Sequence, residues 1–183
     1  FPVKTIAPKI ESLKKLPEPV YFITGNHEYY SDWESWKSLL ETFHFHLLLD
    51  QNTIIQHGEA RIMLAGVTDP GADRSGSGQP RGVEVAVQGA PAADYRILLA
   101  HQPGEVFDAE KHGFDLQLSG HTHGGQFFPW NYAIGLFHPY VRGLNRHGKM
   151  WIYVSQGTGF WGPPIRLGTR SEITLLTLRS DEG

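Results

Sequence analysis

Residues 114–126 read FDLQLSGHTHGGQ, and this stretch decides the fold. Its first half is apolar at every second or third position and predicts a buried strand over residues 114–120. His121 and His123 follow the strand directly and lie two positions apart, so in an extended segment both side chains face the same way. Three glycines leave room for an ion beside the two imidazoles: Gly120, Gly124 and Gly125.

Polar residues also follow two other predicted strands at the point where each strand ends. Asn26 and His27 come after the apolar run VYFIT at residues 20–24, and His101 ends the run RILLAH at residues 96–101. In open α/β sheets, sites form at the carboxyl ends of the strands. Imidazoles and an amide oxygen suit a borderline divalent ion such as Zn, Mn or Fe. The sequence therefore predicts a divalent metal site among these strand-end residues: Asn26, His27, His101, His121 and His123.

The remaining pattern predicts an α/β fold. The unit over residues 96–120 reads as strand, helix and strand, which indicates a parallel crossover. Ser31 with Glu34 three residues later predicts the start of a helix that ends near Phe43. We expect further helices at 5–16 and 105–112, strands at 47–57, 61–67, 150–156 and 172–178, and a surface loop at 71–82. No repeat or linker divides the sequence, so we expect one domain over residues 1–183.

Composition excludes several classes of function. The chain has 183 residues, 40% of them hydrophobic, and a net charge of −3, so a nucleic-acid partner is not expected. It contains no cysteine, which excludes disulfides, thiolate metal sites and a cysteine nucleophile. No apolar run has the length of a membrane span and no signal peptide is evident. Because the chain opens without Met, we treat it as a fragment or a processed product.

Three motifs together resemble the calcineurin-like metallophosphoesterases, in particular a bacterial, membrane-associated branch. The motifs are GNHEYY from Gly25, LAHQP from Leu99 and SGHTHGGQ from Ser119, with the tail GTGFWGPPIRLG from Gly157. The resemblance implies that Asn26, His101 and His121 bind one metal ion and that His123 binds another. It also implies that His27 acts over the substrate phosphate as a general acid or charge stabiliser, while a metal-activated hydroxide attacks phosphorus.

The resemblance also implies two earlier signatures, Asp-x-His and Gly-Asp-x-x-Asp, that should precede Gly25. The 24 residues before Gly25 contain neither Asp nor His. We therefore expect a partial α/β/β/α sandwich with mixed sheets, N-terminal strands missing, and a site of neutral ligands only. Glu28, Asp32 and Asp69 are candidate replacement carboxylates, although Asp69 suits a turn and Glu28 a helix start or a residue behind the ligands.

A sandwich that lacks strands exposes a sheet edge, and such edges pair with other chains. We therefore expect a homo-oligomer or a complementing chain. Arg166 is a candidate substrate-binding residue because arginine pairs well with phosphate. An apolar substrate groove near the site is a further possibility, and core packing is the alternative for its candidate residues: Tyr29, Tyr30, Phe127, Phe128, Trp130 and Trp161. The other histidines show no pattern, although His138 and His147 follow the last motif closely enough for a substrate role.

Three functions remain open at this stage. The first is metal-dependent hydrolysis of a small-molecule or lipid phosphate ester, with a phosphomonoester, phosphodiester or pyrophosphate linkage. The second is a mononuclear hydrolase of carboxylic esters, since an activated hydroxide also attacks acyl carbon. The third is a catalytically impaired fragment that binds metal or a partner. Localisation is open as well, and a membrane-associated bacterial parent protein is implied by the resemblance alone.

Overall fold

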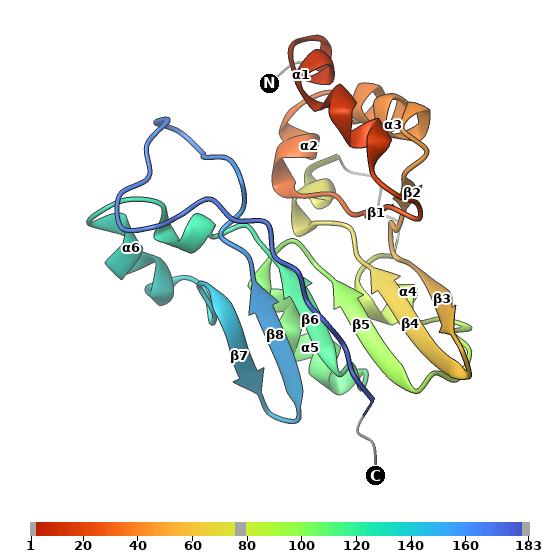
Figure 1. Ribbon diagram of the computed structural model, residues 1–183. Coiled ribbons are helices and arrows are strands. Elements are labelled where there is room, and N and C mark those ends of the chain that lie inside the picture. Colours follow the sequence, from red (N-terminus) through yellow and green to blue (C-terminus); the bar gives the residue numbers. More distant parts are fainter. Residues whose placement is uncertain (1–2, 76–79, 181–183) are drawn as a thin grey trace.

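A six-stranded mixed sheet organises the computed structural model, which describes residues 3–75 and 80–180 (Figure 1). The strand order is β3-β4-β5-β6-β8-β7. Its strands are β3 (Gln51–His57), β4 (Ala60–Gly66), β5 (Tyr95–Leu99), β6 (Leu116–Ser119), β7 (Gly143–His147) and β8 (Met150–Val154). The four central strands run parallel, and β3 and β7 pair antiparallel at the two edges. The predicted mixed α/β fold is confirmed, with its parallel crossover between β5 and β6.

One face of the sheet carries most of the core. Alternate side chains of the strands point to this face and pack against α4 (Val83–Ala86) and α5 (Val106–Lys111), which lie behind the sheet in Figure 1. Leu98 and Ile152, from β5 and β8, are fully buried there. The continuous apolar runs in the sequence reflect this burial, because a parallel strand needs apolar residues on both faces.

The opposite face is covered less completely. A short parallel pair, β1 (Tyr21–Phe22) with β2 (His46–Leu47), brings Tyr21 and Ile23 onto it. The chain after residue 170 runs across the same face in an extended form (Figure 1). The strand predicted at 172–178 is wrong, because this segment pairs with no described strand although its apolar residues alternate as in one. Ile173 and Leu175 are each 91% exposed, whereas Leu176 lines a hollow against the sheet.

Helices near the N-terminus lie beyond the carboxyl ends of the strands (Figure 1): α1 (Val3–Ile10), η1 (Glu11–Lys15), α2 (Asn26–Tyr30) and α3 (Trp33–Thr42). The helix predicted at 5–16 is therefore an α-helix followed by a 3-10 turn. Ser31 does not cap α3. Asp32 takes that place, because its carboxylate accepts the Ser35 backbone N–H at 3.3 Å and the Ser35 hydroxyl at 2.5 Å.

The remaining short elements lie in the connections. They are η2 (Pro70–Ser75), η3 (Pro103–Glu105), η4 (His123–Gly125), α6 (Trp130–Ala133) and η5 (Ile134–Leu136). The predicted loop at 71–82 thus begins with a 3-10 turn, and its residues 76–79 lie outside the described structure. Within residues 3–75 and 80–180, none of the helices combines the length and the apolar character that crossing a membrane requires.

Candidate metal centre

Three predicted ligands converge where the strands end. Asn26 opens α2 just after β1, His101 follows β5, and His121 follows β6. The Oδ1 atom of Asn26 lies 3.0 Å from Nε2 of His101, and Nδ1 of His121 lies 3.1 Å from the same Nε2. His101 is therefore the centre of the cluster. Gly25 allows this, because a Cβ atom there would sit 2.9 Å from Cε1 of the His101 ring.

The spacing of these donor atoms fits a shared metal ion. Ligands at about 2.1 Å from an ion and at right angles to one another lie about 3 Å apart. The two separations at His101 match that value. Two imidazoles and an amide oxygen also suit a borderline divalent cation. Asn26, His101 and His121 would therefore hold such an ion on one side, leaving further positions for water or substrate.

His123 is brought toward the same pocket by a strained turn. His121, His123 and Gln126 have φ angles of 69°, 51° and 50°, in the left-handed region that residues other than glycine seldom adopt. Thr122 closes the turn, because its hydroxyl donates to the Val141 carbonyl at 2.6 Å and accepts the Gly124 N–H at 3.3 Å. Such backbone strain is typical of functional sites, where the surrounding structure enforces it.

Arg166 holds His123 from the other side. Its Nη1 donates to the His123 carbonyl at 3.2 Å, and its Nη2 lies 3.3 Å from His123 Nδ1. The guanidinium also donates to the carbonyls of Gln156, Gly157, Gly159 and Arg170. These contacts make Arg166 a positioning residue for His123, and its predicted contact with a substrate phosphate stays a prediction. If Nδ1 of His123 accepts this hydrogen bond, the proton of the neutral ring is on Nε2.

The four histidines of the predicted site, His27, His101, His121 and His123, share one pocket of about 400 Å³ with Asn26. His27 is an exposed residue on the first turn of α2 and packs edge-on against Tyr30, with ring centroids 5.5 Å apart. The other lining residues include Trp130, Trp161 and His138. The His138 ring packs edge-on against the His121 ring, with ring centroids 5.1 Å apart. His147 lies elsewhere, at the end of β7, with Nδ1 3.0 Å from the Tyr140 hydroxyl oxygen.

The candidate carboxylates have structural roles. Glu28 accepts the Gly25 N–H at 2.6 Å at the start of α2, and burial is the main cause that raises its pKa. Asp69 is buried and accepts from the Gly71 N–H at 2.6 Å and from the Gln102 side chain at 2.9 Å, as its turn role requires. In the described part of the chain, no three His, Asp or Glu side chains form a metal-binding group, so the converging set is two histidines and an amide.

Burial keeps the imidazoles of the site neutral. Burial first, and the neighbouring His121 second, lower the pKa of His101 to about 3. Burial also lowers the pKa of His121, where His138 contributes next, and the pKa of His123, where the Arg166 charge contributes next. Neutral imidazole is the form that binds metal, so the environment prepares these side chains as ligands.

The metal-free chain should lose stability as the pH falls, because His101 cannot take up a proton when folded. The unfolded imidazole gains one below pH about 6.5, while the folded one stays neutral down to a pKa of about 3. The unfolded state then binds more protons, so the free energy of unfolding decreases by about 2 kcal/mol between pH 7 and pH 5. Urea unfolding at the two pH values measures this loss.

The variant His101→Gln should lack this loss of stability, and the variant His57→Gln, at an exposed histidine of β3, should keep it. Equal losses in both variants would contradict the assignment.

One residue of the site was given no role from the sequence. Gln126 is fully buried, and its side-chain amide donates to the Trp161 carbonyl at 2.8 Å and accepts the Trp161 N–H at 2.8 Å. It thereby ties the loop 157–168 to the strained turn. Its place directly after two glycines in GHTHGGQ was the available signal. His138, a candidate for a substrate role because it follows the last motif closely, lines the pocket after α6 and η5.

Comparisons with known proteins identify the family. The family model described as Calcineurin-like phosphoesterase matches residues 2–125. A bovine "Transmembrane protein with metallophosphoesterase domain" is 41% identical over 171 residues, covering 87% of this chain and 38% of that protein. An "Uncharacterized metallophosphoesterase" of Helicobacter pylori strain J99 is 38% identical over 178 residues, covering 96% of this chain and 46% of the relative. The chain therefore spans less than half the length of these relatives.

A solved structure supports the fold. A "Putative 5'-Nucleotidase from Staphylococcus aureus in complex with alpha-ketoglutarate" aligns with a TM-score of 0.58 at 13% identity, over 97% of this chain and 42% of that one. At this identity the likeness concerns the fold alone. The family match extends through the histidine motif at Ser119–Gly125 and includes every converging ligand. The chain therefore belongs to the calcineurin-like phosphoesterase family.

Proposed function

We propose that this chain forms the histidine side of a metal-dependent phosphate ester hydrolase. The observation that carries the proposal is the convergence of Asn26 Oδ1 and His121 Nδ1 on His101 Nε2, at 3.0 Å and 3.1 Å. His27 and His123 line the same pocket. Family membership supports phosphoester hydrolysis in general, and the choice of Mn, Fe or Zn is inferred from the donor set alone.

A divalent ion at this site would polarise a phosphoryl oxygen and lower the pKa of water. The protein's own groups would do the rest. The Asn26 amide and the neutral His101 and His121 rings would fix the ion beside the substrate. His27, exposed at the start of α2, would donate a proton to the leaving oxygen or hydrogen-bond to the phosphoryl group. Arg166 would keep His123 in place through its carbonyl contacts.

A substrate panel separates the three candidate functions. The chain, loaded in turn with Mn²⁺, Fe²⁺ or Zn²⁺, would be offered bis(4-nitrophenyl) phosphate, 4-nitrophenyl phosphate and 4-nitrophenyl acetate. Release of nitrophenol from a phosphate ester supports the proposal. Turnover of the acetate alone would identify a carboxylic esterase. Inactivity of a folded, metal-loaded sample would identify an impaired fragment, an outcome favoured by the lack of a converging carboxylate among the described residues.

The variant His27→Gln tests the proton donor. We expect kcat to fall about 100-fold or more on a phosphate ester with an alkyl leaving group, and less on a nitrophenyl ester whose leaving group needs no proton. Metal content should stay unchanged, because His27 is not among the ligands. The control variant His57→Gln, at an exposed histidine far along the chain, should keep full activity. An equal loss on both leaving groups would exclude His27 as the acid.

We also propose that another strand pairs with the extended segment 171–178. Ile173 and Leu175 are each 91% exposed, whereas Thr174 and Leu176 line a hollow with Leu118 of β6. This alternation is typical of a strand with one free face. A second copy or a complementing chain could supply the pairing strand and further ligands. Light scattering of the chain alone and elemental analysis of the same sample test this. A monomer with fewer than two metal ions per chain would exclude a complete site made by self-association.

Localisation remains a proposal as well. The bovine relative, named as a transmembrane protein, matches 87% of this chain, and we propose that this protein works at a membrane.

A further inference from the structure

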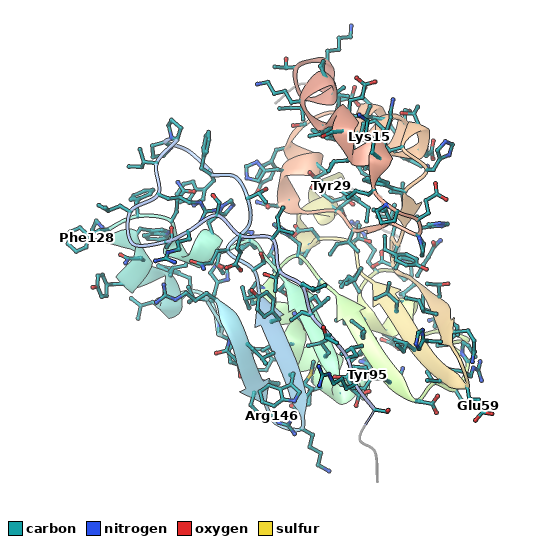
Figure 2. The ribbon with its side chains drawn as sticks, viewed as in Figure 1. Lys15, Tyr29, Glu59, Tyr95, Phe128 and Arg146 are labelled. Atoms are coloured by element: carbon teal, nitrogen blue, oxygen red, sulfur yellow. The ribbon has the colours of Figure 1, made fainter. Side chains whose placement is uncertain are left out.

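An unusual number of large apolar side chains is exposed around α6. We define the aromatic lobe as residues 127–138, which include α6 and η5, together with the loop 157–168. Its exposed apolar side chains are Phe128 (62%), Tyr132 (77%), Leu136 (84%), Phe137 (67%), Phe160 (50%), Trp161 (38%), Ile165 (53%) and Leu167 (61%). Figure 2 shows Phe128 at the outer end of the molecule, on the side opposite to Glu59. A contiguous apolar surface of this kind marks an interaction site.

The two parts of the lobe form one surface. The Phe127 and Trp161 rings lie 6.2 Å apart, which joins the loop to the segment before α6. Together these parts line a hollow of about 530 Å³, with few polar groups: Phe127, Pro129, Trp130, Tyr132, Ala133 and Trp161. Trp130 and Trp161 also line the histidine pocket. The apolar surface therefore continues into the opening of the metal centre.

The charge of this part of the chain is one-sided. Residues 116–171 contain no Asp or Glu, but they contain five of the Lys and Arg residues. All 19 acidic residues lie in the rest of the chain. The net charge of −3 is therefore the sum of a basic region, residues 116–171, and a more strongly acidic remainder. Arg142 and Arg170 are exposed and lie next to the two lobe segments in the sequence. Arg146 and Lys149 belong to the β7–β8 hairpin, whose end lies away from Phe128 in Figure 2.

We propose that the aromatic lobe docks on the surface of an anionic lipid bilayer. Trp, Tyr and Phe rings favour the headgroup boundary, and nearby arginines are attracted to anionic lipids. The lack of any acidic residue in 116–171 removes the repulsion that such a surface would otherwise cause. Because Trp130 and Trp161 connect the lobe with the histidine pocket, docking places that pocket at headgroup depth. This inference is independent of catalysis, since binding is measured without substrate.

Vesicle flotation of the full chain tests the proposal. Vesicles of phosphatidylcholine alone are compared with vesicles of equal parts phosphatidylcholine and phosphatidylglycerol. The double variant Tyr132→Ser/Leu136→Ser removes two of the most exposed lobe side chains. The matched control, Leu16→Ser/Phe107→Ser, removes two exposed apolar side chains that lie outside the lobe. Circular dichroism verifies the fold of each variant, and light scattering without vesicles records its mass.

We expect the chain and the control variant to float with the anionic vesicles, less so at high salt. The lobe variant should bind about tenfold more weakly or not at all, because its apolar contact is lost. Arg142→Gln should weaken binding to anionic vesicles while leaving binding to neutral vesicles unchanged. Failure of the folded chain to float would overturn the proposal, and so would an equal loss in the control variant. A fall in mass for the lobe variant without vesicles would instead identify the lobe as a contact between copies.

Discussion

Replacement of His101 by alanine will remove most of the affinity of this chain for divalent metal. His101 is the only residue of the converging set that contacts both others, Asn26 at 3.0 Å and His121 at 3.1 Å. Its loss removes a ligand and also the contact that holds the other two at ligand spacing. We expect the dissociation constant to rise on the order of 100-fold or more, since even residues behind the ligands are worth 10- to 100-fold. Isothermal titration with Mn²⁺ and Zn²⁺ measures the change.

Two variants make this result interpretable. His138→Ala removes a ring that packs at 5.1 Å from His121 but does not belong to the converging set. It should change metal affinity much less than His101→Ala. Asn26→Asp keeps the shape of the side chain and adds a negative charge, so it should tighten binding. If His101→Ala binds metal as tightly as the unmodified chain does, the metal centre proposed here is wrong.

The variant Leu98→Ala should destabilise the fold by about 3 kcal/mol, the middle of the range for a buried leucine. Leu98 lies in β5 with no exposed surface, packed among residues of β4, β8, α4 and α5. Removal of its side chain leaves a cavity that the surrounding strands cannot close. Thermal unfolding followed by circular dichroism should show a midpoint lower by roughly 6 to 12 °C for a domain of this size.

Leu136→Ala is the matched control for that experiment. The same atoms are removed, but Leu136 is 84% exposed on η5, so we expect a change within about 0.5 kcal/mol. If both variants are equally destabilised, Leu136 is covered in solution, and the lobe is then occupied by another molecule. If neither is destabilised, the sheet is not the folding core.

The sequence predicts the sheet well because buried parallel strands have a strong signal. The run at 96–101 is apolar on both faces, so its strand assignment does not depend on register. The run at 114–120 alternates apolar and polar residues, which is the period of a strand. The metal ligands follow from the same fact, since Asn26, His101 and His121 all stand where a strand has just ended. Chain topology alone brings such positions together, so their proximity can be predicted without information on side-chain packing.

Other features depend on information that no local pattern contains. The segment 172–178 has the alternation of a strand, yet a strand requires a hydrogen-bonded neighbour, and none is present in the described chain. Ser31 and Asp32 are both good cap residues, and the choice of Asp32 depends on one residue of register. His138 and Gln126 reach the site through an irregular segment that has no period to read. The contacts of Arg166 are likewise not readable from a local pattern, because all five of its N–H donors face groups of the protein that are distant in sequence or irregular in structure.

The contacts of Arg166 have a consequence for the loop 157–168. That loop contains neither helix nor strand, yet the guanidinium of Arg166 bonds the carbonyls of Gln156 and Gly159 near the loop's start, each at 2.6 Å. The bonds act as a non-covalent cross-link that closes the loop into a short ring. Most of its conformational entropy is then lost during folding and not at the moment of contact with a partner. The loop is thus a rigid template and not a flap, and a lysine at position 166, without the planar fork, would loosen it.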